Sequence, residues 1–220
     1  MVKHKNKAGR SYGQSRVSSI ATTNPKQAIR YLKGTEGYAL YFKPSNDDVI
    51  ACGDASFAIK RSQTGTVVKV GGNTVCWRSS KQPQVAKSTA DSEVTAMAAT
   101  AILGDYVKTL RESLLIPTPT FELKCDNRAA IVLATGEGSW KTKALANRVQ
   151  GVKEPVERGE IIVSYIGTKD QVADCLTKFL PGPLMADTRK LLSLYSLKTL
   201  MPQTNKLRSA ALRVMRAKVG

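Results

Sequence analysis

The chain has 220 residues, of which 42% are hydrophobic and 23% charged, so it can form one folded domain and is too apolar for a disordered chain. No stretch approaches the roughly eighteen consecutive apolar residues of a membrane-spanning helix, which excludes that class. Its 34 basic and 17 acidic residues give a net charge of +17.

The positive charge is concentrated at the two ends of the chain. Residues 1–35 carry eight basic residues and residues 188–220 carry eight more, with no acidic residue in either stretch. The body between them is nearly neutral, with 18 basic and 17 acidic residues. Such ends either bind polyanions by neutralising phosphates or serve as solvated tails. We expect ten of these residues to bind RNA or an RNA–DNA hybrid: Lys3, Lys5, Lys7, Arg10, Arg16, Lys206, Arg208, Arg213, Arg216 and Lys218.

The N-terminal half predicts a short helix followed by strands. Asn24 before Pro25 is typical of a helix start, and the helix is expected to end at Gly34. Alternating or continuous apolar runs then predict strands over residues 38–42, 49–57, 64–70 and 73–79. The dipeptide Gly71-Gly72 predicts a hairpin turn between the last two of these strands.

The longest predicted helix begins after Ser88, with Asp91 three residues later as in a capping box. Its expected apolar stripe is Val94, Met97, Ala98, Ala101, Ile102, Leu110 and Leu114. The remaining elements are expected to be strands over 121–125 and 161–166 and helices over 128–134, 141–158 and 171–179, the last ended by Pro181-Gly182-Pro183. This order predicts an α/β fold with a mixed sheet covered by helices.

A cationic amphipathic helix is expected over residues 205–219. Its apolar stripe suits docking on a partner protein, RNA or a membrane surface, or packing on its own domain.

Four acidic residues stand where acids are uncommon or where elements change. Asp54 lies inside an apolar strand, Glu93 on the first turns of the long helix, Asp126 at a strand end, and Asp174 between Ala173 and Cys175. Convergent carboxylates repel one another, but they suit Mg²⁺, and two such ions can activate water for phosphodiester hydrolysis. Each acid could also be a helix cap or an exposed residue.

Other site chemistries are excluded or disfavoured by the residues present. The only histidine is His4, so the body holds no Ser-His-Asp triad and no histidine zinc site. Nucleotide-binding glycine loops are absent as well. The four cysteines form no C-x-x-C pair, which favours reduced thiols inside the cell; the nucleus, cytoplasm and mitochondrion all remain open.

At these same residues the chain resembles the ribonuclease H domain of copia-type LTR retrotransposon polyproteins. The resemblance rests on collinear blocks: Arg30-Tyr31-Leu32-Lys33-Gly34-Thr35, Gly53-Asp54-Ala55-Ser56, Arg61-Ser62-Gln63-Thr64-Gly65, Trp77-Arg78-Ser79-Ser80-Lys81-Gln82, Ser88-Thr89-Ala90-Asp91-Ser92-Glu93, Cys125-Asp126-Asn127 and Gln171-Val172-Ala173-Asp174-Cys175-Leu176-Thr177-Lys178. The first block is similar to the end of a reverse transcriptase.

The resemblance implies a ribonuclease H-like fold with a mixed five-stranded sheet. It implies that Asp54, Glu93, Asp126 and Asp174 are catalytic ligands of two Mg²⁺ ions. The implied activity is endonucleolytic cleavage of RNA in RNA–DNA hybrids. The domains are then a basic arm (1–25), a reverse transcriptase remnant (26–46), the ribonuclease H-like domain (47–195) and the C-terminal basic helix (196–220).

The chain also departs from the family pattern. Ala144 and Gln150 stand where the family has histidines, Phe57 replaces a tryptophan, and Val94 replaces a tyrosine. Together with the cationic ends, these departures favour an alternative hypothesis. In it, the chain is a domesticated, non-catalytic RNA-binding subunit of a ribonucleoprotein such as a ribosome or mitochondrial ribosome, where its C-terminal helix contacts other proteins.

Overall fold

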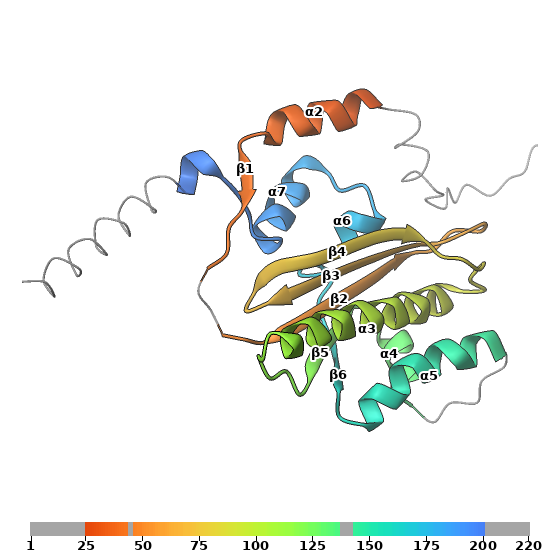
Figure 1. Ribbon diagram of the computed structural model, residues 1–220. Coiled ribbons are helices and arrows are strands. Elements are labelled where there is room, and N and C mark those ends of the chain that lie inside the picture. The colour runs from red at the N-terminus through yellow and green to blue at the C-terminus, as the bar shows by residue number, and fades with distance from the viewer. Residues whose placement is uncertain (1–24, 44–45, 137–142, 201–220) are drawn as a thin grey trace, which may run out of the picture.

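The computed structural model describes residues 25–43, 46–136 and 143–200, and its centre is a mixed five-stranded sheet (Figure 1). The strands are β2 (Val49–Ser56), β3 (Gln63–Val70), β4 (Asn73–Lys81), β5 (Phe121–Cys125) and β6 (Ile161–Tyr165), in the spatial order β4-β3-β2-β5-β6. The first three pair antiparallel, whereas β2–β5 and β5–β6 are parallel. The mixed five-stranded sheet predicted from the sequence is confirmed.

The β3–β4 hairpin forms where the glycine pair predicts it. Val70 pairs with Asn73, so the loop consists of Gly71 and Gly72 alone. Both glycines have positive φ, 54° and 76°, as a two-residue turn of this hand requires. The turn sets the register of the first pairs of the hairpin, and an irregularity between Val68 and Lys69 shifts the register beyond them.

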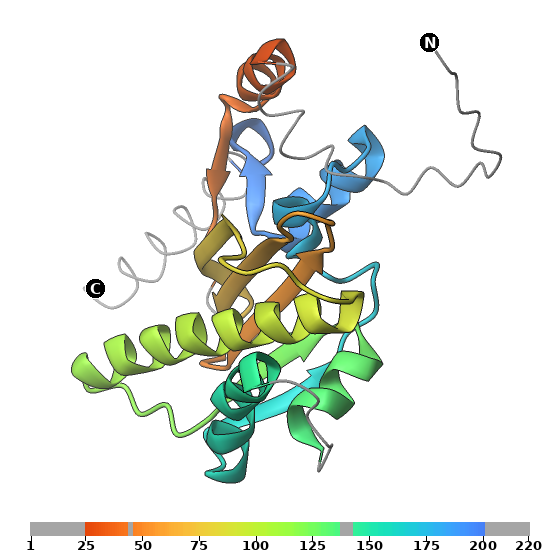
Figure 2. The same cartoon turned by 90° about the vertical axis from the view of Figure 1, so that its right-hand side faces the viewer.

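One face of the sheet is covered by α3 (Thr89–Ser113), α4 (Arg128–Thr135) and α5 (Lys143–Glu157), as Figures 1 and 2 show. Buried Val94, Met97, Leu123, Val149 and Val152 belong to the core on this side. The predicted cap of α3 is present, because Ser88 accepts a hydrogen bond from the Asp91 N–H, and Asn127, which was not predicted as a cap, caps α4 by accepting one from Ala130. This side therefore follows local sequence rules closely.

The opposite face carries α6 (Asp174–Thr177) and α7 (Gly182–Leu191) over a smaller apolar cluster. Cys52 and Val67 of the sheet meet Val172 and Ala173 there. Beyond them, β1 (Tyr38–Leu40), which follows helix α2 (Pro25–Thr35), pairs antiparallel with β7 (Leu194–Ser196) in a separate two-stranded sheet. No helix within the described parts of the chain is long and apolar enough to cross a membrane.

Two sequence predictions about the second half of the domain are wrong. The helix expected over 171–179 is one turn, because the Gln171 side chain donates to the Gly53 carbonyl at 2.9 Å and Lys178 is extended. The Pro181-Gly182-Pro183 segment begins a helix rather than ending one. Pro181 precedes α7 and Pro183 lies in its first turn, where the backbone N–H that proline lacks would have no partner within the helix.

The predicted apolar stripe of α3 is correct only for its first half. Ile102, Leu110 and Leu114 are exposed, and the buried face continues instead through Thr100, Gly104, Val107 and Arg111. The reason is the close approach of the helix to the sheet, which small side chains permit. A Cβ on Gly104 would lie 2.4 Å from the Phe121 ring.

We expect Gly104→Ala to lower the free energy of unfolding, because overpacking typically costs about 1–3 kcal/mol, more than the roughly 1 kcal/mol that alanine adds to helix stability. Gly151→Ala is the matched control, since that glycine lies within α5 and an added Cβ meets nothing within 4 Å. It should raise stability by up to about 1 kcal/mol. Urea denaturation of both variants measures this, and equal effects of one sign would contradict the close packing of α3 on β5.

Candidate nuclease active site

The candidate site is built around Asp54, which lies in the middle of β2 with no exposed surface. Its carboxylate accepts hydrogen bonds from the Thr177 hydroxyl and, at 3.1 Å, from the Lys178 ammonium group. Both donors come from α6 and the residue that ends it. An aspartate inside an apolar strand is therefore stabilised by polar partners from the covering segment.

Gly65 allows α6 to come this close. It is the cross-strand partner of Asp54 on β3. A Cβ at this position would lie 2.7 Å from the Ala173 carbonyl oxygen and 2.8 Å from Cγ2 of Thr177. The missing side chain is thus what lets α6 dock against the sheet within hydrogen-bond reach of Asp54.

The other three predicted acids come from three different elements. Glu93 lies in the second turn of α3, and its Oε2 accepts the Ala55 N–H of β2 at 3.2 Å. Asp126 follows the last residue of β5 and accepts the Thr168 hydroxyl at 3.3 Å. Asp174 begins α6. Each position is fixed by an element that packs on the central strand.

The structure brings these acids together. Carboxylate oxygens of Asp54, Asp126 and Asp174 lie within 4.8 Å of one another. Glu93, Asp126 and the Cys125 sulfur form a second group within the same limit. Because Asp126 belongs to both groups, the four carboxylates form one continuous cluster.

The acids raise one another's affinity for protons. Burial, followed by the charges of Asp54 and Asp126, raises the pKa of Glu93 to about 8. Burial likewise raises the pKa of Asp174 to about 6, although the hydrogen bond from Lys178 opposes the increase. Burial and mutual repulsion both disfavour the ionised carboxylates, and a bound cation would offset both effects.

Lys178 is the residue of this site that the sequence analysis did not single out. Its ammonium group lies 3.1 Å from Asp54 Oδ1 and 2.8 Å from Asp174 Oδ1, and it bridges the two carboxylates. The neighbouring acids raise its pKa above the ordinary value of lysine, although burial opposes this. The spacing of four residues between Asp174 and Lys178, as on one helix face, was the available sequence feature.

The donor set fits a hard divalent cation. All four carboxylates offer oxygen, the ligand type that Mg²⁺ prefers. The one soft atom nearby, the Cys125 sulfur, is a poor ligand because burial raises the pKa of its thiol to about 12 and keeps it protonated. Asp54, Asp126 and Asp174 could hold such an ion, and Glu93 with Asp126 could contribute ligands to a second.

Several predicted features lie elsewhere. The ten basic residues expected to bind nucleic acid, and the helix expected over 205–219, are outside the described residues. Gln150, at one of the positions where the family has histidine, is exposed and donates to Glu154 on its own helix. From α5 it is instead Arg148 that reaches α3, donating to Asp91 at 2.8 Å.

Comparison with known proteins places this site in context. The chain is 28% identical over 176 residues to the Retrovirus-related Pol polyprotein from transposon TNT 1-94 of Nicotiana tabacum, and 30% identical over 160 residues to that from transposon RE1 of Arabidopsis thaliana. These matches cover 78% and 70% of the chain. The chain is similar to a segment of retrotransposon Pol polyproteins. It spans only 13% and 11% of the length of these two relatives. No family model matches it.

Ribonucleases H are among the solved structures similar to this chain. RNase H1 from Halobacterium salinarum NRC-1 aligns with a TM-score of 0.48 at 15% identity, covering 64% of this chain and 98% of that chain. LC11-RNase H1 in complex with an RNA/DNA hybrid aligns with a TM-score of 0.47 at 14% identity, covering 59% and 93%.

The raised pKa of Glu93 predicts how stability changes with pH when no divalent ion is present. A carboxyl whose pKa is higher in the folded chain binds more protons folded than unfolded, so stability falls as pH rises between the two values. That window runs from 4.5 to about 8 for Glu93 and from 3.8 to about 6 for Asp174. Between pH 6 and 8 the decline therefore comes mainly from Glu93, at no more than about 1.4 kcal/mol per pH unit.

We expect Glu93→Gln to flatten the stability profile between pH 6 and 8 in EDTA, measured by urea denaturation. Glu157→Gln, a change to an exposed residue near the end of α5, should keep the wild-type slope. A Glu93→Gln variant with an unchanged slope would show that Glu93 does not titrate in this window.

Proposed function

We propose that this chain is a ribonuclease H of the copia retroelement type, which cleaves RNA in RNA–DNA hybrids with the help of Mg²⁺. The observation that carries the proposal is the convergence of four carboxylates, from β2, α3, the end of β5 and α6, on one point. The similarity to retrotransposon Pol polyproteins supports it, because it covers 78% and 70% of the chain in two such relatives.

The residues of the chain would divide the chemistry as follows. Asp54 is held rigidly by β2 and by its two donors, so it fixes the position of the cluster. Asp126 is less buried and belongs to both ligand groups, which suits a residue shared between two ions. When bound, two Mg²⁺ ions supply an activated water and stabilise the leaving oxygen of the phosphodiester.

Glu93 would change protonation state as the site fills. Its pKa of about 8 means that its carboxyl is largely protonated at neutral pH without a cation. Positive charge in the cluster favours the ionised form, so the proton leaves Glu93 for solvent. The Ala55 N–H then stabilises the carboxylate through the hydrogen bond already formed at 3.2 Å.

Cleavage of a labelled RNA–DNA hybrid with Mg²⁺ tests the proposal. Asp126→Asn should lower the rate about 10²-fold or more, because the loss of several kcal/mol of electrostatic stabilisation corresponds to at least that factor. Asp105→Asn is the matched control, since Asp105 is exposed on α3 and outside the cluster; it should cleave at the wild-type rate. Circular dichroism should show that both variants are folded. Absence of cleavage by the folded wild-type chain would refute the proposed activity.

A second candidate function rests on Lys178. Its ammonium group already supplies positive charge between Asp54 and Asp174, so the cluster is partly neutralised without any ion. That arrangement is what a non-catalytic descendant would need in order to keep its buried acids. In that case the chain is a domesticated RNA-binding subunit of a ribonucleoprotein.

The two candidates differ in how Lys178 affects cation binding. If the cluster takes Mg²⁺ or Mn²⁺, Lys178→Met should tighten Mn²⁺ binding several-fold in isothermal titration calorimetry, because a competing positive charge is removed. Lys108→Met, on α3 at the opposite face of the sheet, should leave the affinity unchanged. If neither the wild-type chain nor Lys178→Met binds Mn²⁺, the nuclease proposal fails and the structural role is favoured.

A further inference from the structure

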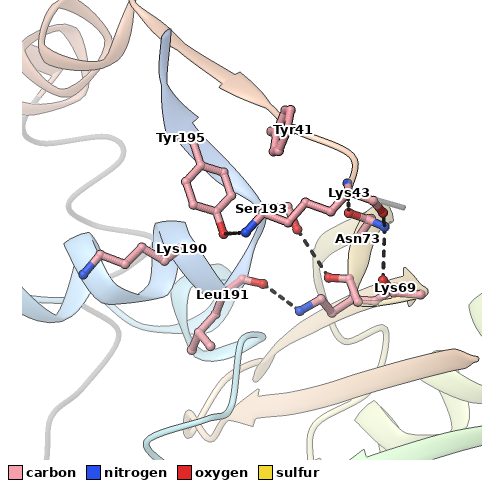
Figure 3. Close-up of a pocket in the computed structure, with 10 residues that line it drawn as sticks. Tyr41, Lys43, Lys69, Asn73, Lys190, Leu191, Ser193 and Tyr195 are labelled. Carbon is pink, nitrogen blue, oxygen red and sulfur yellow. Dashed lines mark hydrogen bonds between the residues drawn. The ribbon is translucent and has the colours of Figure 1, made fainter. Parts of the chain in front are cut away.

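A pocket of about 340 Å³ lies where the two-stranded sheet meets the β3–β4 turn (Figure 3). Its lining is basic and aromatic and includes no acidic residue: Tyr41, Lys43, Lys69, Asn73, Lys190 and Tyr195 contribute its side chains, together with Leu191 and Ser193. A volume at the small end of the range for ligand sites suits a compact group rather than a large cofactor.

The walls of this pocket are held by several polar contacts. Asn73 accepts the Lys43 N–H at 2.8 Å and donates to the Lys43 carbonyl at 2.9 Å, which ties the segment after β1 to the hairpin. The Ser193 hydroxyl donates to the Gly72 carbonyl at 3.3 Å from the other side. Tyr41 meets Tyr195 edge to face, with ring centres 6.2 Å apart. The pocket is therefore formed before any ligand arrives.

Two lysines supply positive charge that no carboxylate offsets within the described structure. Lys69 is partly buried and donates to the Leu191 carbonyl at 2.7 Å, and Lys43 lies over the Tyr195 ring at 4.9 Å and contacts its hydroxyl. Neither forms an ion pair among the described residues. Lys190 differs, because it pairs with Asp187 at 3.0 Å and points away from the other two amines in Figure 3.

Burying a positive charge without a counter-ion is unfavourable, and the pKa of Lys69 reflects this. Burial lowers the pKa of Lys69, so its environment disfavours the charged form. An anion placed between Lys43 and Lys69 would replace the lost hydration and receive hydrogen bonds from both amines. Phosphate is the natural anion for two lysines beside a tyrosine hydroxyl.

The pocket and the carboxylate cluster share one face of the sheet. Ile50 pairs with Lys69, and Ile50, Cys52 and Asp54 alternate onto the same side of β2. Lys69 lies on β3 opposite Ile50, and Asp54 is four residues further along β2. The Cα atoms of Lys69 and Asp54 are therefore about 14 Å apart.

We propose that this pocket binds a backbone phosphate of the nucleic acid strand whose cleavage site lies at the carboxylate cluster, a few nucleotides away. Lys43 and Lys69 contact the phosphate oxygens, and Tyr195 lies beside the sugar. The inference rests on the proposed function for the identity of the strand. It adds a substrate contact on the body of the domain, separate from the basic ends of the chain.

Binding of a labelled RNA–DNA hybrid, measured by fluorescence anisotropy at several salt concentrations, tests the inference. Ca²⁺ replaces Mg²⁺ so that the hybrid stays intact. Lys43→Met and Lys69→Met should each weaken binding and lower the slope of log K against log salt by about 1, the value for one phosphate contact. Lys69→Arg keeps the charge and should keep the slope, while Lys108→Met on the opposite face serves as the control. Unchanged slopes in both methionine variants would overturn the inference.

The position of the contact can be tested with single neutral methylphosphonate linkages placed along each strand in turn. At the one linkage that the pocket contacts, a fixed number of steps from the cleaved bond, Lys43→Met should have no further effect on affinity. If Lys43→Met weakens every such hybrid equally, the pocket does not contact a defined phosphate and the inference fails.

Adenosine monophosphate distinguishes a strand from a free nucleotide as the source of the phosphate. Direct binding of millimolar adenosine monophosphate that Lys43→Met abolishes, with hybrid binding unaffected by the lysine variants, would assign the pocket to free nucleotides and overturn the inference. Failure of the proposed function gives a different result, namely a wild-type chain that binds the hybrid with a lysine-dependent slope but does not cleave it in Mg²⁺.

Discussion

The site and the fold around it depend on the burial of one carboxylate, that of Asp54, in the central strand. A buried carboxylate is strongly destabilising unless it is paired and hydrogen-bonded. Here the partners, Thr177 and Lys178, come from the far end of the domain in sequence. Asp54 therefore requires the one-turn helix α6 to dock on β2 and β3, and Gly65 leaves the space for it. The position of Asp174 follows, because it begins the same turn.

On the opposite side of the sheet, close packing of α3 brings a further carboxylate, that of Glu93, to the cluster. Glu93 reaches the cluster because α3 crosses β2 closely enough for its carboxylate to accept the Ala55 N–H. This approach depends on small residues, since a Cβ on Gly53 would lie 2.3 Å from the Thr100 hydroxyl. Two glycines on adjacent strands thus let one helix approach from each face. The carboxylates converge because both helices lie unusually near the backbone of the sheet.

The parts of the fold that the sequence predicts well are those set by local rules. Strand alternation, the Gly71-Gly72 turn and the Ser88 cap all act within a few residues, and each is present as expected. The segment from Gln171 to Ser196 follows other constraints. Gln171 is held by the Gly53 carbonyl, and Ser193 adopts a positive φ of 62°, a conformation to which serine has no intrinsic preference. Its short helix, α7 and β7 were consequently mispredicted or missed. The four acids were found by their places in or at the ends of predicted elements and by the family resemblance, whereas Lys178 is one of 34 basic residues, marked in the sequence only by its spacing from Asp174.

This same segment connects the carboxylate cluster to the basic pocket. Its start provides Asp174, Thr177 and Lys178, and its end provides Leu191, Ser193 and Tyr195. Because both ends are anchored on one face of β3, at Gly65 and at Lys69, the distance between the two sites is fixed by the strand rather than by a loop. A nucleic acid strand that contacts both sites would therefore find the carboxylate cluster and the basic pocket at a fixed distance from each other. Positioning of this kind allows binding at one point to hold the phosphodiester in register at the other, as catalysis by orientation requires.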